Sequence, residues 1–505
     1  MSPVTDLPAR VNQKVAVSVV FVSAMFISIM DTSIVNVALP SIGRDFQISA
    51  TSVDGISISF LVSLAVFMPA SGWLGDRFGG KRVLMAAIAI FTVASALCGL
   101  ASSLPELVAF RVLQGLGGGM LAPVGTAMLY RAFPPEERVR AASILIVPTA
   151  LAPAIAPVVG GLLVTDASWR WVFYVNVPVG IAALTFGSLF VRQHAESMPG
   201  HFDWRGFALS GVGLGLFMFG ISEGPDLGWD SPEILATLVV GAVLLAVTVI
   251  WELRVTEPII ALRLFGNRLF RSSSGALVMV SIAFFGVVFA ITLYFQDGRG
   301  LSALNAGLSQ FPSAIGMMAG SQLSSRVLYW RLGPRRHLTI GLCGVTLFIA
   351  LLALMGPDTS LWWARLILLG MGFSMAQVMV PAQASAFATI SPADTGRAST
   401  LYNISRQLGS AIGVALLTTI IVIVGPVHVV GGHLVANFAA YRICFLVAAG
   451  CALLGTVASL NINDAEAAKT MVDPRARKKL AVAAEAAAAA GAGAGSPATG
   501  PTRAA

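Results

Sequence analysis

Residues 72–82 read GWLGDRFGGKR and connect two long apolar segments of the chain. Gly75 and Gly79 permit a tight turn between closely packed helices, because glycine lacks a Cβ and adopts conformations that other residues avoid. Asp76 can pair with a cation or accept a hydrogen bond from the amino terminus of a helix. We therefore predict a conformational switch here, with a plain solvated loop as the alternative. The switch residues are Gly72, Gly75, Asp76, Arg77, Gly79, Lys81 and Arg82.

The composition of the chain places these apolar segments in a membrane. Hydrophobic residues make up 56% of the 505 residues and charged residues only 11%, whereas about a quarter of the residues of a soluble domain are charged. Lipid permits only helices and closed barrels to span it. Segments 15–29 and 342–355 lack the alternation of period two that a barrel strand shows over roughly ten residues. We predict an all-α integral membrane protein.

Fourteen apolar segments are long enough to cross about 30 Å of hydrocarbon, which takes roughly twenty helical residues. Their predicted starts are near Val15, Val53, Arg82, Pro105, Arg140, Trp169, Gly206, Ile234, Phe270, Ala303, His337, Leu361, Ala398 and Phe438. An even number of spans puts both termini on the same side of the membrane.

The distribution of loop cations assigns that side. With the amino terminus in the cytoplasm, the cytoplasmic loops hold Arg77, Lys81, Arg82, Arg131, Arg138, Arg140, Arg263, Arg268, Arg271, Arg331, Arg335 and Arg336. The opposite loops hold Arg44, Arg170, Arg299 and Arg442. Because cytoplasmic loops are enriched in Lys and Arg, we predict that both termini of this multi-pass protein lie in the cytoplasm. We expect the membrane to be the plasma membrane. Orientation then explains the basic residues, and we expect no nucleic-acid partner.

The second half of the chain repeats part of the first. Residues 77–82 (RFGGKR) recur as 331–336 (RLGPRR), and Arg111 recurs as Arg365 at the same separation. Chance similarity between basic loops is the alternative. We predict two six-helix bundles related by pseudo-two-fold symmetry, plus two inserted helices. The divisions are a cytoplasmic segment at 1–14, a bundle at 15–192, a linker with two extra transmembrane helices at 193–262, a second bundle at 263–463 and a largely disordered cytoplasmic tail at 464–505.

Several motifs resemble those of one transporter family. Residues 72–82 resemble the signature between helices two and three of the major facilitator superfamily. Residues 30–40 (MDTSIVNVALP) resemble the helix-one motif of its fourteen-helix drug:proton antiporter branch, and 111–117 (RVLQGLG) resemble the helix-four motif. Residues 168–180 (SWRWVFYVNVPVG) resemble the opening of helix six, and the match extends through 406–409 (RQLG). The order and spacing of these motifs make the resemblance specific.

The resemblance implies proton-coupled export of hydrophobic or cationic drugs by alternating access. Export of an endogenous lipid, siderophore or metabolite is one alternative, and a non-transporting membrane sensor or scaffold is another. Two positions depart from the family pattern, because Ala156 replaces a glycine of the helix-five motif and Gly80 replaces an arginine of the basic loop. Both departures bear on how efficiently substrate exchanges for protons.

Ionisable side chains within the predicted spans need a reason, since a charge at mid-helix costs about 3 kcal/mol on insertion scales. Asp31 is the one deep acid of the first bundle, and a proton neutralises a carboxylate but not a guanidinium. We predict that Asp31 carries the proton and communicates with Arg111, directly or through Gln114 and water. A role for Asp31 in pinning helix one is the alternative. Arg365 and Arg406 are predicted to stabilise the second bundle, with substrate contact as the alternative.

Predicted helix five combines prolines with a pair of glycines. An interior proline removes a backbone hydrogen bond and bends the helix, which favours a gating element at the bundle interface. The frequency of proline in membrane helices offers a plainer explanation. The predicted hinge residues are Pro153, Pro157, Gly160 and Gly161.

A substrate site is expected between the bundles near mid-membrane, as in other transporters built from repeats. Aromatic, methionine and amide side chains suit bulky apolar or cationic molecules, although each could equally face lipid or the core. The candidates are Phe26, Met30, Asn36, Gln114, Met120, Phe284, Tyr294, Gln310, Met375, Gln377 and Asn403.

Other chemistry finds no support in the sequence. The four cysteines lie in apolar runs without a CxxC or Cys/His cluster, so we expect no disulfide and no metal site. The five histidines are expected in loops or at helix edges, and no Ser/His/Asp set is apparent, so we expect neither an enzyme nor a cofactor. Residues 75–82 begin like a phosphate-binding loop, but Arg82 stands where a hydroxyl residue is required. The expected partners are a small-molecule substrate, protons and the lipid bilayer, and we expect a monomer.

Overall fold

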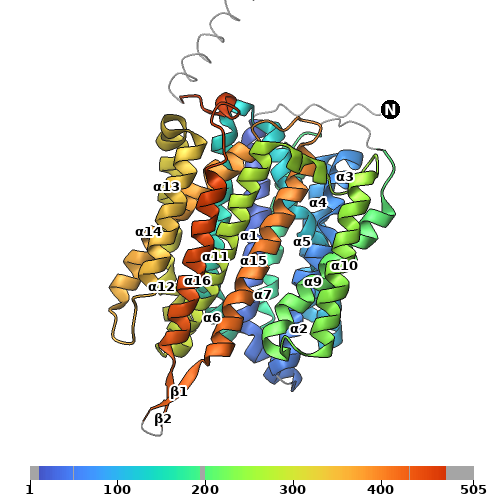
Figure 1. Ribbon diagram of the computed structural model, residues 1–505. Coiled ribbons are helices and arrows are strands. Elements are labelled where there is room, and N and C mark those ends of the chain that lie inside the picture. The colour runs from blue at the N-terminus through green and yellow to red at the C-terminus, as the bar shows by residue number, and fades with distance from the viewer. Residues whose placement is uncertain (1–10, 49, 194–199, 431–432, 474–505) are drawn as a thin grey trace, which may run out of the picture.

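The computed structural model describes residues 11–48, 50–193, 200–430 and 433–473. Long helices run roughly side by side, and an antiparallel hairpin of β1 (Val427–Val430) and β2 (His433–Ala436) projects from one end of the molecule (Figure 1). We call this the hairpin end, and we call the opposite end, where the first helix begins, the Gln13 end. The all-α prediction therefore holds for the body of the protein, and the hairpin is an addition to it.

The helices follow one another in a regular order. The first half contains α1 (Gln13–Phe46), α2 (Ala50–Phe67), α3 (Ala70–Phe78), α4 (Gly80–Leu100), α5 (Leu104–Ala132), η1 (Pro135–Glu137), α6 (Arg138–Asp166), α7 (Trp171–Tyr174) and α8 (Asn176–Phe190). The middle contains α9 (Trp204–Leu227), α10 (Pro232–Arg254) and η2 (Leu262–Gly266). The second half contains α11 (Arg268–Leu293), η3 (Tyr294–Gly298), α12 (Ala303–Leu323), η4 (Ser324–Leu328), α13 (Tyr329–Leu352), α14 (Leu361–Ala386), α15 (Thr395–Val424), α16 (Phe438–Ser459) and η5 (Ala468–Thr470).

Twelve helical segments in the described part of the chain are long and apolar enough to cross a bilayer. The α2–α3 pair passes the same test as a unit that is bent by 56°. One of the twelve, Leu304–Leu352, has 49 residues, and a straight helix of that length would measure about 73 Å, more than twice the thickness of the hydrocarbon. Gly333 interrupts it with φ 74° and ψ 159°.

Most predicted helix starts lie within a few residues of the observed ones. Two differ more. The segment expected at His337 begins at Tyr329, because the basic loop stays helical on both sides of Gly333. The segment expected at Trp169 opens with the short helix α7 and continues from Asn176 in α8.

The two basic loops share an unusual backbone conformation. Gly79 has φ 86° and ψ 136°, and Gly333 has φ 74° and ψ 159°. Each is the point at which one helix ends and the next begins in a new direction. A side chain is strained at such positive φ values, so both loops require glycine at the same place in their sequence.

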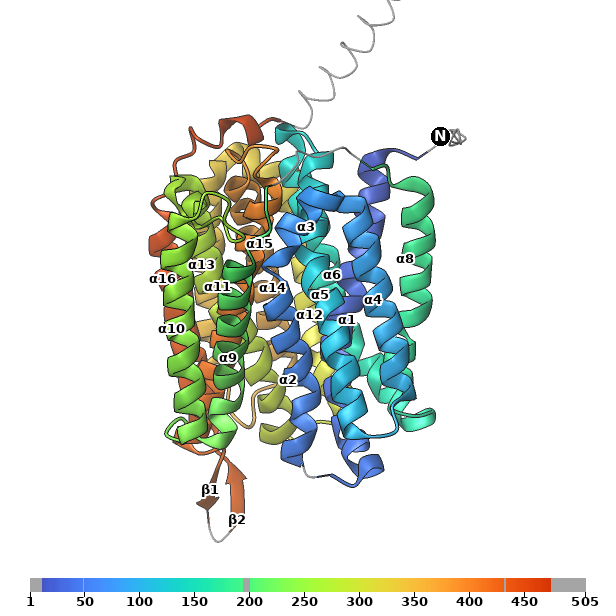
Figure 2. The same ribbon diagram turned by 90° about the vertical axis from the view of Figure 1, so that its right-hand side faces the viewer.

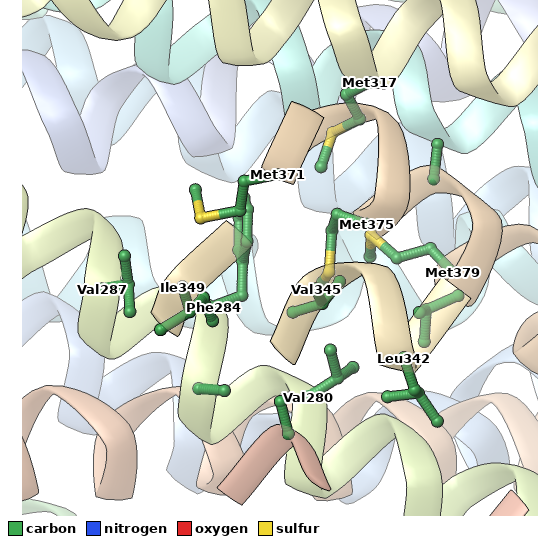
Figure 3. Close-up of a cluster of buried hydrophobic side chains, with 14 of the residues drawn as sticks. Val280, Phe284, Val287, Met317, Leu342, Val345, Ile349, Met371, Met375 and Met379 are labelled. Carbon is green, nitrogen blue, oxygen red and sulfur yellow. The ribbon is translucent and has the colours of Figure 1, made fainter. Parts of the chain in front are cut away.

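Buried apolar side chains gather in separate clusters. The largest lies mainly among α11–α16, with a contribution from α6, and its centre is rich in methionine, with Met317, Met371, Met375 and Met379 around Phe284 (Figure 3). The other two clusters lie mainly among α1–α8. Methionine is unbranched and adaptable, which suits a core that must repack as helices move.

Helices α9 and α10 pack against each other, and α9 also contacts α2 and α15, which belong to opposite halves of the chain. The pair lies along one edge of the molecule (Figure 2). Helix α10 exposes Val239, Val243 and Ile250, as expected for a helix surrounded by lipid.

Candidate proton site and gating contacts

Asp31 is completely buried in α1 and is held by side chains from other helices. Its Oδ2 lies 2.5 Å from Nη1 of Arg111 on α5, and its Oδ1 accepts a hydrogen bond of 2.9 Å from the amide of Gln114. The guanidinium of Arg111 also donates to the Gln114 carbonyl oxygen at 2.8 Å. The predicted proximity of these three residues is therefore present as a direct ion pair, while the proton-carrying role of Asp31 stays a prediction.

Two further residues extend the network. The Asn176 amide on α8 donates to Asp31 Oδ1 at 2.8 Å and to the Ser95 hydroxyl on α4 at 3.1 Å. Ser95 in turn donates to the backbone carbonyl of Phe173 at 2.9 Å. Sequence reasoning quoted Asn176 as part of a motif without assigning it to the proton site, and it missed Ser95, because no local pattern links a serine on one helix to a carboxylate on another.

Arg111 is as deeply enclosed as its partner. Its Nε donates to the carbonyl of Ile56 at 3.2 Å, and its guanidinium carbon lies 4.3 Å from the centre of the Phe60 ring. Such stacking on an aromatic face stabilises a cation where water is excluded. Protonation of Asp31 would cancel one charge of the pair and leave Arg111 without a counter-ion, and a buried uncompensated charge is costly.

The predicted switch residues lie at the Gln13 end of the molecule. Asp76 pairs with Arg131 of α5 at 2.8 Å, and both side chains border Gly396, the second residue of α15. A Cβ at Gly72 would come within 2.9 Å of the Thr400 hydroxyl, and that hydroxyl is 3.0 Å from Ser71. Helix α3 therefore packs closely on α15, which belongs to the other half of the chain.

The remaining switch residues play different parts. Lys81 donates to the carbonyl of Ser188 at 2.9 Å. Arg77 and Arg82 are exposed, and Gly79 supplies the turn. A Cβ at Gly75 would meet no atom within 4 Å, so close packing was the wrong reason to expect glycine there.

Further contacts join the two halves at the Gln13 end. Tyr130 of α5 stacks on Phe387, the residue after α14, with 4.4 Å between ring centres. The guanidinium of Arg138 donates to the carbonyl of Phe387. Ser399 of α15 donates to the carbonyl of Pro123 at 2.6 Å. Together with Asp76 and its neighbours, these contacts close this end between the halves.

Helix α6 packs against α1 of the first half and α12 of the second half near its prolines. A Cβ at Gly160 would come within 2.8 Å of Ile34 on α1. Pro157 lies against Gly307 of α12, where a Cβ would be 3.1 Å from the proline ring. A Cβ at Gly161 would meet no atom within 4 Å. Helix α6 is continuous through Pro153, and its role as a hinge stays a prediction.

The predicted cavity residues lie in several environments. Met30 and Met120 are buried in the first half, and Phe26 is half-buried. Asn36 is exposed and accepts a hydrogen bond of 3.0 Å from Ser57. Gln310 donates to the Thr292 hydroxyl at 3.1 Å.

The others are engaged within the second half. Tyr294 belongs to an aromatic cluster and donates to the carbonyl of Gly356 at 2.9 Å. Asn403 donates to the Ser399 carbonyl of its own helix at 2.9 Å. Phe284 and Met375 lie in the methionine-rich cluster of Figure 3.

Gln377 belongs to a buried polar cluster that sequence reasoning missed. Its side-chain oxygen lies 2.7 Å from Nε2 of His337, and its amide donates to the carbonyl of Gly320 at 2.9 Å. His337 was expected at a helix edge but is 1% exposed within α13. The Gln-His spacing across two helices carries no sequence signal that could have revealed it.

The 461–473 segment covers the Gln13 end between the two halves. Asp464 accepts a hydrogen bond of 2.8 Å from the backbone of Arg335, and the hydroxyls of Tyr329 and Thr470 are 2.8 Å apart. The segment helps to line a cavity of about 390 Å³ whose other walls are Arg140 and its neighbours on α6 and the η4 region. The tail predicted to begin at 464 therefore remains part of the folded body up to 473.

Comparison with known proteins agrees with this architecture. A family model described as Major Facilitator Superfamily matches residues 21–414. The chain is 31% identical over 392 residues to the multidrug resistance protein B homolog of Mycobacterium tuberculosis, covering 76% of this chain and 72% of that protein. It is 32% identical over 388 residues to the tetracenomycin C resistance and export protein of Streptomyces glaucescens, covering 75% and 71%.

A solved structure, the human organic anion transporter MFSD10 (TETRAN), shares the fold with a TM-score of 0.62 at 17% identity, over 88% of this chain and 99% of that chain. The apolar helices make the protein a multi-pass membrane protein, and the relatives indicate a transporter rather than an enzyme. The sequence resemblance to a transporter family is thus confirmed, and the chain belongs to the Major Facilitator Superfamily.

Proposed function

We propose that this protein is a proton-coupled exporter that moves hydrophobic or cationic drugs and related small molecules out of the cell across the plasma membrane. The observation that carries the proposal is the buried Asp31–Arg111 pair, enclosed by Gln114 and Asn176. The names of two relatives, a multidrug resistance protein and a tetracenomycin C resistance and export protein, support drug export.

The chain would cross the membrane fourteen times. Two features support this number: the bent α2–α3 pair is counted as one span, and the Leu304–Leu352 segment is divided at Gly333 into two. The shared backbone conformation of Gly79 and Gly333 supports pseudo-two-fold related bundles at 15–192 and 263–463, joined by α9 and α10. The concentration of Arg and Lys at the Gln13 end supports a cytoplasmic location for that end and for both termini.

The transport cycle uses the proton to change the network around Asp31. In the ionised state, the carboxylate holds Arg111, Gln114 and Asn176 and thereby ties α1 to α5 and α8. A proton that arrives from outside neutralises Asp31. The Arg111 guanidinium then forms hydrogen bonds with other acceptors, and α1 and α5 shift relative to each other. The contacts of Asp76 and Phe387 at the Gln13 end open in the same cycle and expose the substrate site to the cytoplasm.

The driving force is sufficient for export against a gradient. One elementary charge moving down 100 mV supplies about 2.3 kcal/mol, which corresponds to roughly a fifty-fold concentration ratio for a neutral molecule exchanged for one proton. A direct test uses the purified protein in liposomes with an imposed pH gradient. Accumulation of ethidium that an uncoupler abolishes supports the proposal. Accumulation that is independent of the pH gradient, or a failure to move any of a panel of drugs, contradicts it.

A further inference from the structure

Arg406 is a charged side chain near the middle of α15 that is half-buried in the protein. It lies eleven residues from the start of a helix of 30 residues, which places it about 17 Å along the axis from the Gln13 end. Among the described residues, no side chain or backbone group forms a hydrogen bond or ion pair with its guanidinium. A charge at this depth marks a functional site by default.

The direction of Arg406 follows from the helix period. Ser399 of α15 contacts Pro123 of α5 across the boundary between the two halves, at 2.6 Å. Arg406 follows Ser399 by seven residues, or two helical turns, so both side chains lie on the same face of α15. Helix α15 packs against α11 of its own half and against α5 of the first half. Arg406 therefore faces the first bundle, about 10 Å farther from the Gln13 end than the Ser399 contact.

Two other intramembrane arginines contact protein groups in different ways. Arg111 is neutralised by Asp31. Arg365 lies near the start of α14, where its guanidinium carbon is 4.9 Å from the centre of the exposed Trp362 ring. Arg365 has no acidic partner among the described residues, but it lies at the end of its helix, whereas Arg406 places its charge near mid-helix on the face toward the first bundle.

Aromatic rings separate this charge from the Gln13 end. Tyr402 lies one helical turn from Arg406 toward that end and meets the Phe387 ring edge-on at 5.6 Å, and Phe387 stacks on Tyr130. The three rings are only 1–2% exposed, so a planar apolar molecule can contact them only after the Gln13 end opens. An acidic group on that molecule would then lie toward Arg406.

From this arrangement we propose that Arg406 recognises an anionic group on the substrate, so that the preferred cargo is an aromatic or amphiphilic organic anion. This inference rests on the proposed export function but replaces cationic drugs by organic anions as the preferred substrate class, because a fixed cation repels cationic drugs and stabilises carboxylate, sulfonate or phenolate groups. Exchange of one inward proton for one outward monoanion would also move two elementary charges inward, whereas exchange for a monocation would move none. Transport should therefore respond strongly to the membrane potential.

The test compares two dyes in proteoliposomes under the same pH gradient, the monoanion 1-anilinonaphthalene-8-sulfonate and the monocation ethidium. We expect the wild-type protein to prefer the anion. Arg406→Gln should raise the KM for the anion about tenfold, as expected for loss of a charged hydrogen bond, with little effect on the KM for ethidium. Arg406→Lys should retain most of the preference, and Arg406→Glu should reverse it.

Arg365→Gln is the matched control, because it removes another intramembrane arginine of the second half and should leave the ratio of the two rates unchanged. The ratio is measured within each preparation, so a loss of folded protein does not alter it. Wild-type transport of ethidium without the anion, or an equal loss of both rates in Arg406→Gln, overturns the inference and leaves the proposed export function intact. Transport of neither dye counts against the export function itself.

Discussion

The Asp31 carboxylate and the Arg111 guanidinium lie 2.5 Å apart, with side-chain exposures of 0% and 1%. They come from α1 and α5, and each has further partners that hold it in place. A buried pair of this kind contributes little net stability. Removal of only one partner is nevertheless costly, because the other charge is then buried without compensation. Its energetic and functional consequences can be separated by mutation.

Arg111→Gln should lower the stability of the protein by about 3–5 kcal/mol, because the ionised Asp31 would remain buried without its cation. The double variant Arg111→Gln with Asp31→Asn should recover much of that loss, since both charges are then absent. Thermal unfolding in detergent, followed by tryptophan fluorescence, measures both. Equal stabilities of the single and double variants would show that the two charges do not interact.

Gly79→Ala should destabilise the connection between α3 and α4 by about 1–3 kcal/mol, because a side chain is strained at φ 86°. Gly75→Ala is the matched control in the same segment, since its Cβ meets no atom within 4 Å and its backbone is helical. The melting temperature should fall in the first variant and stay close to that of the wild type in the second. Similar melting temperatures in both would argue against a conformational requirement at Gly79.

Asp76→Asn should weaken closure of the Gln13 end, because the Arg131 guanidinium loses its charged acceptor beside Gly396. The expected shift toward the open arrangement is about 1–3 kcal/mol, the usual effect of removing one partner of a charged hydrogen bond. The measurement uses an Ala127→Cys reporter in a background without reactive native cysteines. A hydrophilic maleimide should label this reporter faster in Asp76→Asn than in the protein with Asp76.

Glu137→Gln provides the control for that experiment, since it breaks another ion pair of 2.9 Å, between Glu137 of η1 and Lys14 of α1. The tested pair differs from it because Asp76 and Arg131 border Gly396 of α15 in the other half. Labelling in this variant should match the wild type. Unchanged labelling in Asp76→Asn would mean that the ion pair with Arg131 does not hold the end closed.

Deletion of residues 461–505 should open the cavity that this segment covers. The chain loses the Tyr329–Thr470 and Arg335–Asp464 contacts, so a Ser143→Cys reporter in the cavity wall should react severalfold faster with a hydrophilic maleimide. Deletion of residues 474–505 leaves these contacts in place and should not change the rate. Equal labelling rates in the two truncated proteins would mean that the 461–473 segment does not restrict access to the cavity.

Sequence reasoning predicted what depends on hydropathy and on rare residues. The long apolar runs fixed most helix positions, and the cost of a buried charge singled out Asp31 and Arg111 before any distance was known. The sequence could not reveal the other hydrogen-bond partners of the Asp31 carboxylate, because the contact between Asn176 and Asp31 depends on how α8 packs against α1. The helical structure of the basic loop up to Gly333 was likewise missed, because the residues of this loop are polar and hydropathy alone does not reveal a helix there.

The account depends most directly on proton exchange at Asp31, and one comparison tests it. Asp31→Asn and wild-type protein are placed in liposomes and assayed for dye exchange without a pH gradient and for dye accumulation with one. Asp45→Asn serves as the control. Asp45 lies on α1, as Asp31 does, but its half-exposed carboxylate pairs with Arg170 outside that helix. We predict that Asp31→Asn exchanges dye across the membrane yet no longer accumulates it in response to the gradient, whereas Asp45→Asn does both. Accumulation by Asp31→Asn at the wild-type rate would contradict the account.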